Sequence, residues 1–71
     1  MNTEKSLTKR ILTKRLVLSG KPTLANPLIN EIQELQGDVT YTQAMNASKH
    51  LTNVPFLRKA YNTMINEAFE A

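Results

Sequence analysis

The chain has 71 residues, no cysteine and one histidine, and its formal net charge at pH 7 is +3. This length allows one small domain, and the composition excludes disulfides, thiolate metal sites and histidine-rich metal sites. No apolar run is long enough to span a membrane. The chain has few large apolar side chains, so their burial contributes less free energy than the conformational entropy that folding costs. We therefore expect a marginal fold or one that needs a partner.

The charge is divided unevenly along the chain. Residues 1–21, the basic N-terminal segment, carry six basic side chains and one acidic one, whereas residues 22–71 carry three basic and five acidic side chains. Cations at this density attract phosphate groups or acidic protein surfaces. The opposite charge of the two parts also permits head-to-tail self-association, or neutralisation within one chain.

Apolar residues follow a helical spacing in each of the four segments that glycine and proline separate. We therefore expect an all-α fold, a small bundle of about four short helices that forms one domain over residues 1–71. The predicted helices cover residues 4–18, 27–36, 41–51 and 54–69. Residues 15–18 and 39–42 also fit short strands, and this alternative stays open for both.

The first predicted helix has apolar side chains on two sides. Leu7, Ile11 and Leu18 lie within about 40° of one another on a helical wheel, and we expect this side to face the core. Leu12 and Leu16 form a second apolar pair on another side of the helix. A spare apolar pair beside concentrated charge predicts a partner interface at Leu12 and Leu16, either for a homodimer or for another protein.

Capping signals set the expected limits of the first two helices. Gly20 is typical of a left-handed C-cap, and Pro22 indicates that the first helix does not continue. Asn26 is a good N-cap and Pro27 suits the first helical position, so we expect the second helix to begin there. Gly37 is expected to end it.

Residues 41–69 form the clearest predicted unit, a helical hairpin. Thr40 and Gln43 have the spacing of a capping box, and the last helix has the strongest amphipathic pattern in the chain. Two helices joined by a tight turn have the outline of a helix-turn-helix unit. The glycine that is usual in that turn is missing, so an ordinary helical hairpin is the alternative.

The basic segment and the hairpin together suggest a nucleic-acid surface. Lysine and arginine contact phosphates, and arginine and asparagine on a recognition helix pair with guanine and adenine. The predicted contact residues are Lys5, Lys9, Arg10, Lys14, Arg15, Lys21, Arg58, Lys59, Asn62 and Asn66. The cations of the first helix wrap around it instead of forming one stripe. A solubilising helix is therefore the structural alternative, and no membrane partner is expected.

Catalysis is not expected. His50, the only histidine, lies at the margin of the apolar stripe of the third predicted helix. Glu31 and Glu34 flank apolar positions, which is typical of a solvated helix face. The sequence has no glycine-rich phosphate loop, zinc spacing or calcium loop, so it predicts neither a cofactor nor a metal.

The sequence therefore predicts a small non-enzymatic regulatory protein of the cytoplasm that binds nucleic acid, with duplex DNA as the expected target. The alternative is a protein–protein adaptor or inhibitor that docks on an acidic surface of a larger partner. The positions of the cations in the fold distinguish the two. Convergence of the first-helix cations with Arg58 and Lys59 would favour DNA, whereas their dispersal would favour the adaptor.

Overall fold

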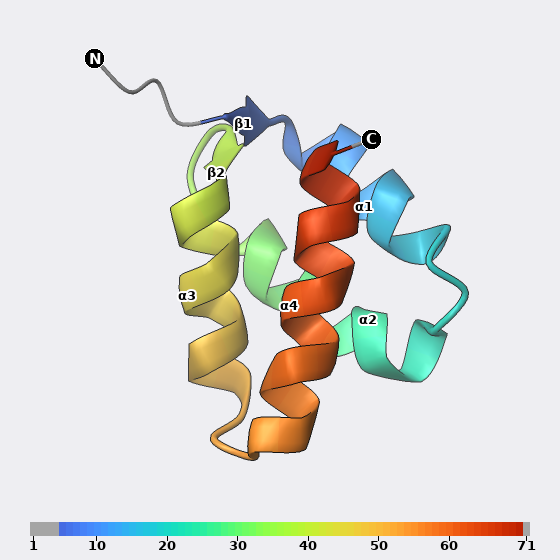
Figure 1. Ribbon diagram of the computed structural model, residues 1–71. Coiled ribbons are helices and arrows are strands. Elements are labelled where there is room, and N and C mark those ends of the chain that lie inside the picture. The colour runs from blue at the N-terminus through green and yellow to red at the C-terminus, as the bar shows by residue number, and fades with distance from the viewer. Residues whose placement is uncertain (1–4, 71) are drawn as a thin grey trace.

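The computed structural model describes residues 5–70, in which four helices and one two-stranded sheet follow the order β1, α1, α2, β2, α3, α4. The elements are β1 (Ser6–Leu7), α1 (Lys9–Val17), α2 (Pro22–Gln33), β2 (Val39–Thr40), α3 (Tyr41–Leu51) and α4 (Pro55–Glu70). In Figure 1, α4 crosses the front of the molecule with α3 and α1 on either side and α2 behind. The predicted all-α bundle with a C-terminal helical hairpin is confirmed.

Two short strands join the start of the described chain to its middle. Ser6 pairs with Thr40 and Leu7 pairs with Val39 in an antiparallel register. The strand alternative for residues 39–42 is thus confirmed for its first half, and the rest of that stretch is helical. The partner strand β1 is not among the elements expected from the sequence.

Helix α1 begins at Lys9, later than predicted, because β1 occupies the residues before it. Thr8 is the N-cap, and its hydroxyl accepts a hydrogen bond from the Ile11 N–H at 3.2 Å. The predicted start at residue 4 lies outside the described residues. The strand alternative for residues 15–18 is wrong, since the helix continues to Val17. The predicted left-handed turn is confirmed at Gly20, which has a φ of 79°.

The buried side of α1 is not the side that the sequence suggested. Leu12 and Leu16 are 0% exposed, whereas Ile11 and Leu18 are 43% and 73% exposed. The expected stripe required Leu7 and Leu18 on one helix, but Leu7 lies in β1 and Leu18 follows the last helical residue. Leu12 and Leu16 are the apolar pair one turn apart within the shorter helix, and they enter the core. The prediction of a partner interface at Leu12 and Leu16 is therefore wrong.

Helix α2 begins at Pro22 instead of Pro27, and it ends at Gln33 instead of residue 36. Pro22 occupies the first turn, where its missing N–H costs nothing. Pro27 lies inside the helix and cannot donate to the carbonyl of Thr23. Both residues are exposed, so water can satisfy that carbonyl. The earlier start brings Ala25 into the core at 1% exposure.

Helices α3 and α4 match their predicted limits to within one residue at each end. The capping box is confirmed by two reciprocal hydrogen bonds, from the Gln43 N–H to the Thr40 hydroxyl at 3.1 Å and from the Thr40 N–H to Gln43 Oε1 at 2.9 Å. The rings of Tyr41 and Phe69 meet edge to face at 5.6 Å. This contact holds the start of α3 against the end of α4.

One apolar core runs through the bundle and takes side chains from every helix and from β2. Its buried members are Leu12, Leu16, Ala25, Leu28, Ile32, Val39, Ala44, Ala47, Tyr61, Met64, Ile65, Ala68 and Phe69. Ser48 is buried with them, and its hydroxyl lies 2.8 Å from the Met45 carbonyl oxygen. Within residues 5–70, no helix is both long enough and apolar enough to cross a membrane.

Candidate functional site

Three of the six cations in the basic N-terminal segment bind main-chain carbonyls at helix ends. Lys9 Nζ donates to the carbonyl of Gln33, the last residue of α2, at 3.2 Å. Arg15 Nη1 donates to the carbonyl of Ala68 at 2.7 Å, and Lys5 Nζ donates to that of Phe69. The last two carbonyls belong to the final turn of α4.

These three side chains supply a charge that the two helices lack. Neither α2 nor α4 has a basic residue in its last turn. The C-terminal end of a helix carries a partial negative charge and unpaired carbonyls, which a nearby cation stabilises. Lys5, Lys9 and Arg15, predicted as phosphate contacts, thus have a structural role. This role is not visible in the sequence, because main-chain carbonyls at a helix end are not marked by any residue type.

The outward side of α1 combines cations with apolar side chains. Arg10 and Lys14 are exposed, and Ile11, Val17 and Leu18 are 43%, 58% and 73% exposed. At 100° per residue, these five positions fall within an arc of about 120°. We call this set of five residues the outer face of α1. Lys21, which is also exposed, follows this helix and is the N-cap of α2, without a side-chain capping bond.

A shallow hollow of about 230 Å³ lies beside the outer face of α1, at the end of that helix. Its lining residues are Arg15, Leu18, Ser19, Met64, Glu67 and Ala68. Leu18 belongs to both features, so one wall of the hollow is an exposed apolar side chain. The Ser19 hydroxyl is buried there without a hydrogen-bond partner. The outer face and this hollow form a continuous surface at the α1–α4 edge.

Most of the predicted base-reading side chains of α4 are engaged with α3 or with the turn before α4. Arg58 Nε donates to the Thr52 carbonyl at 2.9 Å. Asn62 Oδ1 lies 3.2 Å from the Ser48 hydroxyl, and Asn66 Oδ1 accepts a hydrogen bond from the Tyr41 hydroxyl. Lys59 is exposed, so it is the member of this group whose charge lies in solvent.

The cations of α1 and those of α4 do not converge. Arg15 reaches the last turn of α4 at Ala68, whereas Arg58 and Lys59 lie in its first turns. At 1.5 Å per residue, Arg58 and Ala68 are separated by roughly 15 Å along the helix axis. The predicted nucleic-acid contacts are therefore dispersed over the molecule, with Arg10 and Lys14 at one place and Lys59 at another.

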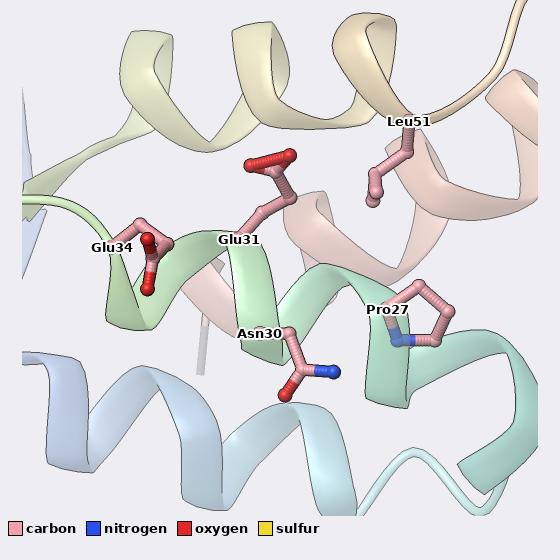
Figure 2. A pocket seen from close by; sticks show the side chains of 5 residues that line it. All are labelled: Pro27, Asn30, Glu31, Glu34 and Leu51. Carbon is pink, nitrogen blue, oxygen red and sulfur yellow. The ribbon is translucent and has the colours of Figure 1, made fainter.

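A second surface lies between α2 and α3, and its charge is acidic. Two adjoining hollows of about 380 and 290 Å³ share Glu31 as a lining residue. We call them the α2–α3 groove, which is lined by Pro27, Asn30, Glu31, Glu34, Leu35, Gln43, Asn46, Ala47, His50 and Leu51. Figure 2 shows Glu31 and Leu51 pointing into the space between the two helices, with Glu34, the C-cap of α2, further along the chain.

The sequence placed Glu31 and Glu34 on a solvated helix face and missed the groove beside them. Glu31 Oε1 lies 3.2 Å from His50 Nδ1, and the His50 side chain is 81% exposed. A surface position for His50 agrees with the expectation. Among residues 5–70, no three acidic or histidine side chains are grouped closely enough to hold a metal ion.

The chain matches no protein-family model, no curated protein and no solved structure. The outer face of α1 and the α2–α3 groove are therefore the two surfaces from which a function can be inferred.

Proposed function

We propose that the protein is a non-enzymatic docking module, an adaptor or inhibitor that binds an acidic surface of a partner protein through the outer face of α1. One observation carries this proposal. Two exposed cations, Arg10 and Lys14, share one side of α1 and its C-cap with three exposed apolar side chains. A partner with carboxylates around an apolar patch would satisfy both kinds of side chain.

The apolar side chains favour a protein over a nucleic acid. Covering Ile11, Val17 and Leu18 removes apolar area from water, which contributes on the order of 1 kcal/mol for each side chain. A phosphate backbone offers no apolar surface to cover them, and protein–DNA interfaces are more polar than protein–protein interfaces. The composition of this face is therefore better matched to a protein.

The number of available cations points the same way. Lys5, Lys9 and Arg15 are bonded to helix ends, which leaves Arg10, Lys14 and Lys21 as the exposed cations of the basic segment that are not held in this way. Each phosphate contact adds to the electrostatic part of DNA binding, so a surface with few exposed cations supplies only a small part of it. Binding to duplex DNA stays a prediction, and the exposed cations, Lys59 included, are what supports it.

Two substitutions in α1 separate a protein target from DNA. Leu18→Ser removes an exposed apolar side chain and leaves the charge unchanged, whereas Lys14→Gln removes a charge and leaves the apolar side chains in place. Lys59→Gln, on α4, is the matched control for the loss of one exposed cation. Each variant and the wild type is immobilised and presented with nuclease-treated cell extract, and each is titrated in parallel with duplex DNA at low and moderate salt.

A docking module predicts one stoichiometric acidic protein that is retained by the wild type and by Lys59→Gln but is lost with both α1 substitutions. A DNA-binding protein predicts retention of DNA at low salt, weakened by Lys14→Gln and unaffected by Leu18→Ser. Recovery of the same protein with the Leu18→Ser variant would contradict the proposed use of the outer face of α1.

A further inference from the structure

The outer face of α1 and the α2–α3 groove have complementary chemistry. The outer face presents Arg10 and Lys14 beside exposed apolar side chains. The groove presents Glu31 and Glu34 beside the apolar side chains of Pro27, Leu35 and Leu51. Opposite charges at the edge of matching apolar areas are the features that select one protein surface for another.

The charges on these two surfaces are not used to neutralise each other within one chain. Among residues 5–70, the one close contact of a carboxylate with a lysine, arginine or histidine side chain is that of Glu31 with His50. The engaged cations of the basic segment bind main-chain carbonyls instead of carboxylates. Arg10, Lys14 and Glu34 therefore keep their charges available to another molecule.

The two surfaces also cannot meet within one molecule. Helix α1 packs against α2 and α4, whereas the groove lies where α2 meets α3. Figure 2 shows α1 on one side of α2 and the groove, with Glu31 and Leu51, on the other. A chain cannot fill its own groove with its own α1, but a second copy can.

We infer that the outer face of α1 in one copy docks in the α2–α3 groove of the next, so that the protein associates with itself head to tail. This inference rests on the proposed function, because it uses the same outer face of α1 and names the acidic α2–α3 groove of a second copy as a surface that this face binds. The contact uses different surfaces on the two copies. Such a contact leaves one free face and one free groove at the ends of every assembly, so the assembly grows unless the rotation closes a ring.

The contact is small and partly electrostatic, which sets the conditions for its detection. One face of the nine-residue helix α1 covers less than the roughly 800 Å² per partner of a standard interface. The association is therefore weak, rises with protein concentration, and falls as salt screens the exposed charges.

Charge reversal at one residue on each surface gives a complementation test. Lys14→Glu disables the face and leaves the groove intact, and Glu34→Lys disables the groove and leaves the face intact. Both side chains are exposed, so circular dichroism of each variant should match the wild type. Lys59→Glu and Glu70→Lys, outside both surfaces, are the matched controls for the same changes in charge.

Sedimentation equilibrium at low salt then measures the average mass relative to the 8.0 kDa chain. We expect the wild type and the two controls to exceed the monomer mass increasingly with concentration, and to return to it at high salt. Lys14→Glu and Glu34→Lys should each stay monomeric. Their equimolar mixture should associate again, because the intact face of one variant fits the intact groove of the other and the two reversed charges are also opposite in sign.

A wild type that stays monomeric at all concentrations would overturn the inference, and so would a mixture that fails to associate while the wild type does. The pull-down with Leu18→Ser and Lys14→Gln separates this failure from that of the proposed function. If the wild type is monomeric and both substitutions still abolish capture of a foreign acidic protein, only self-association is overturned. If capture is unaffected as well, both proposals fail.

Discussion

Arg15 and Ala68 lie fifty-three positions apart in the sequence, and Arg15 Nη1 donates a hydrogen bond of 2.7 Å to the main-chain oxygen of Ala68. The bond joins the last turn of α1 to the last turn of α4. It also places a permanent cation at the negative end of a helix that has no basic residue of its own there. The guanidinium is therefore part of the fold, although the sequence presents it as one of six similar cations.

Replacing Arg15 with alanine should destabilise the protein more than replacing its neighbour Lys14. A hydrogen bond from a charged donor contributes about 1.5 kcal/mol, so we expect Arg15→Ala to lower the free energy of unfolding by about that amount. Lys14→Ala, at an exposed position, should change it by less than about 0.5 kcal/mol. Urea denaturation followed by circular dichroism measures both, and equal effects would show that the bond to Ala68 adds nothing.

Leu16 and Leu18 provide a similar pair for the packing of α1. Leu16 is 0% exposed and Leu18 is 73% exposed. Leu16→Ala leaves a cavity in the core and should cost about 3 kcal/mol, enough to unfold much of a domain of this size. Leu18→Ala should change stability by less than about 0.5 kcal/mol. A greater loss with Leu18→Ala would mean that the other apolar side of α1 is the buried one.

Lys21 is an unfavourable residue at the start of α2, so its replacement should stabilise the protein. It occupies the N-cap without a side-chain capping bond, and the first turn that follows has no acidic residue. Lys21→Asp supplies an acceptor for the free N–H groups and reverses the charge at the positive end of the helix. We expect an increase of about 0.5–1 kcal/mol in the free energy of unfolding. Lys21→Ala, which removes the charge without adding an acceptor, should recover only a small part of this gain.

Tyr61 makes the stability depend on pH in the alkaline range. Burial raises the pKa of Tyr61 above its ordinary value of 10.0, because the ionised phenolate loses its solvation in the core. The unfolded chain therefore releases this proton first, and stability is lost as the pH rises through the ordinary value toward the raised one. Tyr61→Phe removes this dependence.

The comparison of the two proteins isolates Tyr61, because lysine side chains titrate in the same range in both. Urea midpoints measured from about pH 9 to about pH 11 should fall more steeply for the wild type than for Tyr61→Phe. Parallel curves for the two proteins would contradict the assignment.

The C-terminal half of the fold could be read from the sequence because its signals are local. The capping box at Thr40 and Gln43 and the long amphipathic stripe of α4 set helix limits that the structure matches to within one residue. Each signal involves residues within a turn or two of one another. These helix limits can be predicted because the local preference of the residues and the tertiary packing favour the same structure.

The N-terminal half depends on contacts that the sequence does not display. A strand of two residues, β1, has no periodicity, yet its pairing with β2 delays α1 and turns Leu12 and Leu16 inward. Pro27 suits the first position of a helix, but α2 begins five residues before it, at Pro22, and this earlier start buries Ala25. In both cases the tertiary contacts decide between local options of similar free energy.

The candidate site was predicted in composition but not in arrangement. The excess of cations in residues 1–21 is plain in the sequence. Which of them bind carbonyls at helix ends, and which stay exposed, depends on where the ends of α2 and α4 lie. The acidic groove was missed for the same reason, since it exists only where α2 and α3 lie side by side.

The bonds from the basic N-terminal segment to the end of α4 also bear on the order in which the parts of the chain fold. Lys5 and Arg15 bind the carbonyls of Phe69 and Ala68, so each bond closes a loop of more than fifty residues. Closing a loop of this length costs entropy before the bond is made, whereas the hairpin of α3 and α4 needs only contacts between neighbouring parts of the chain. The docking of α1 on the end of α4 should therefore be a late step of folding, and until it occurs Leu12 and Leu16 lack part of the core that covers them.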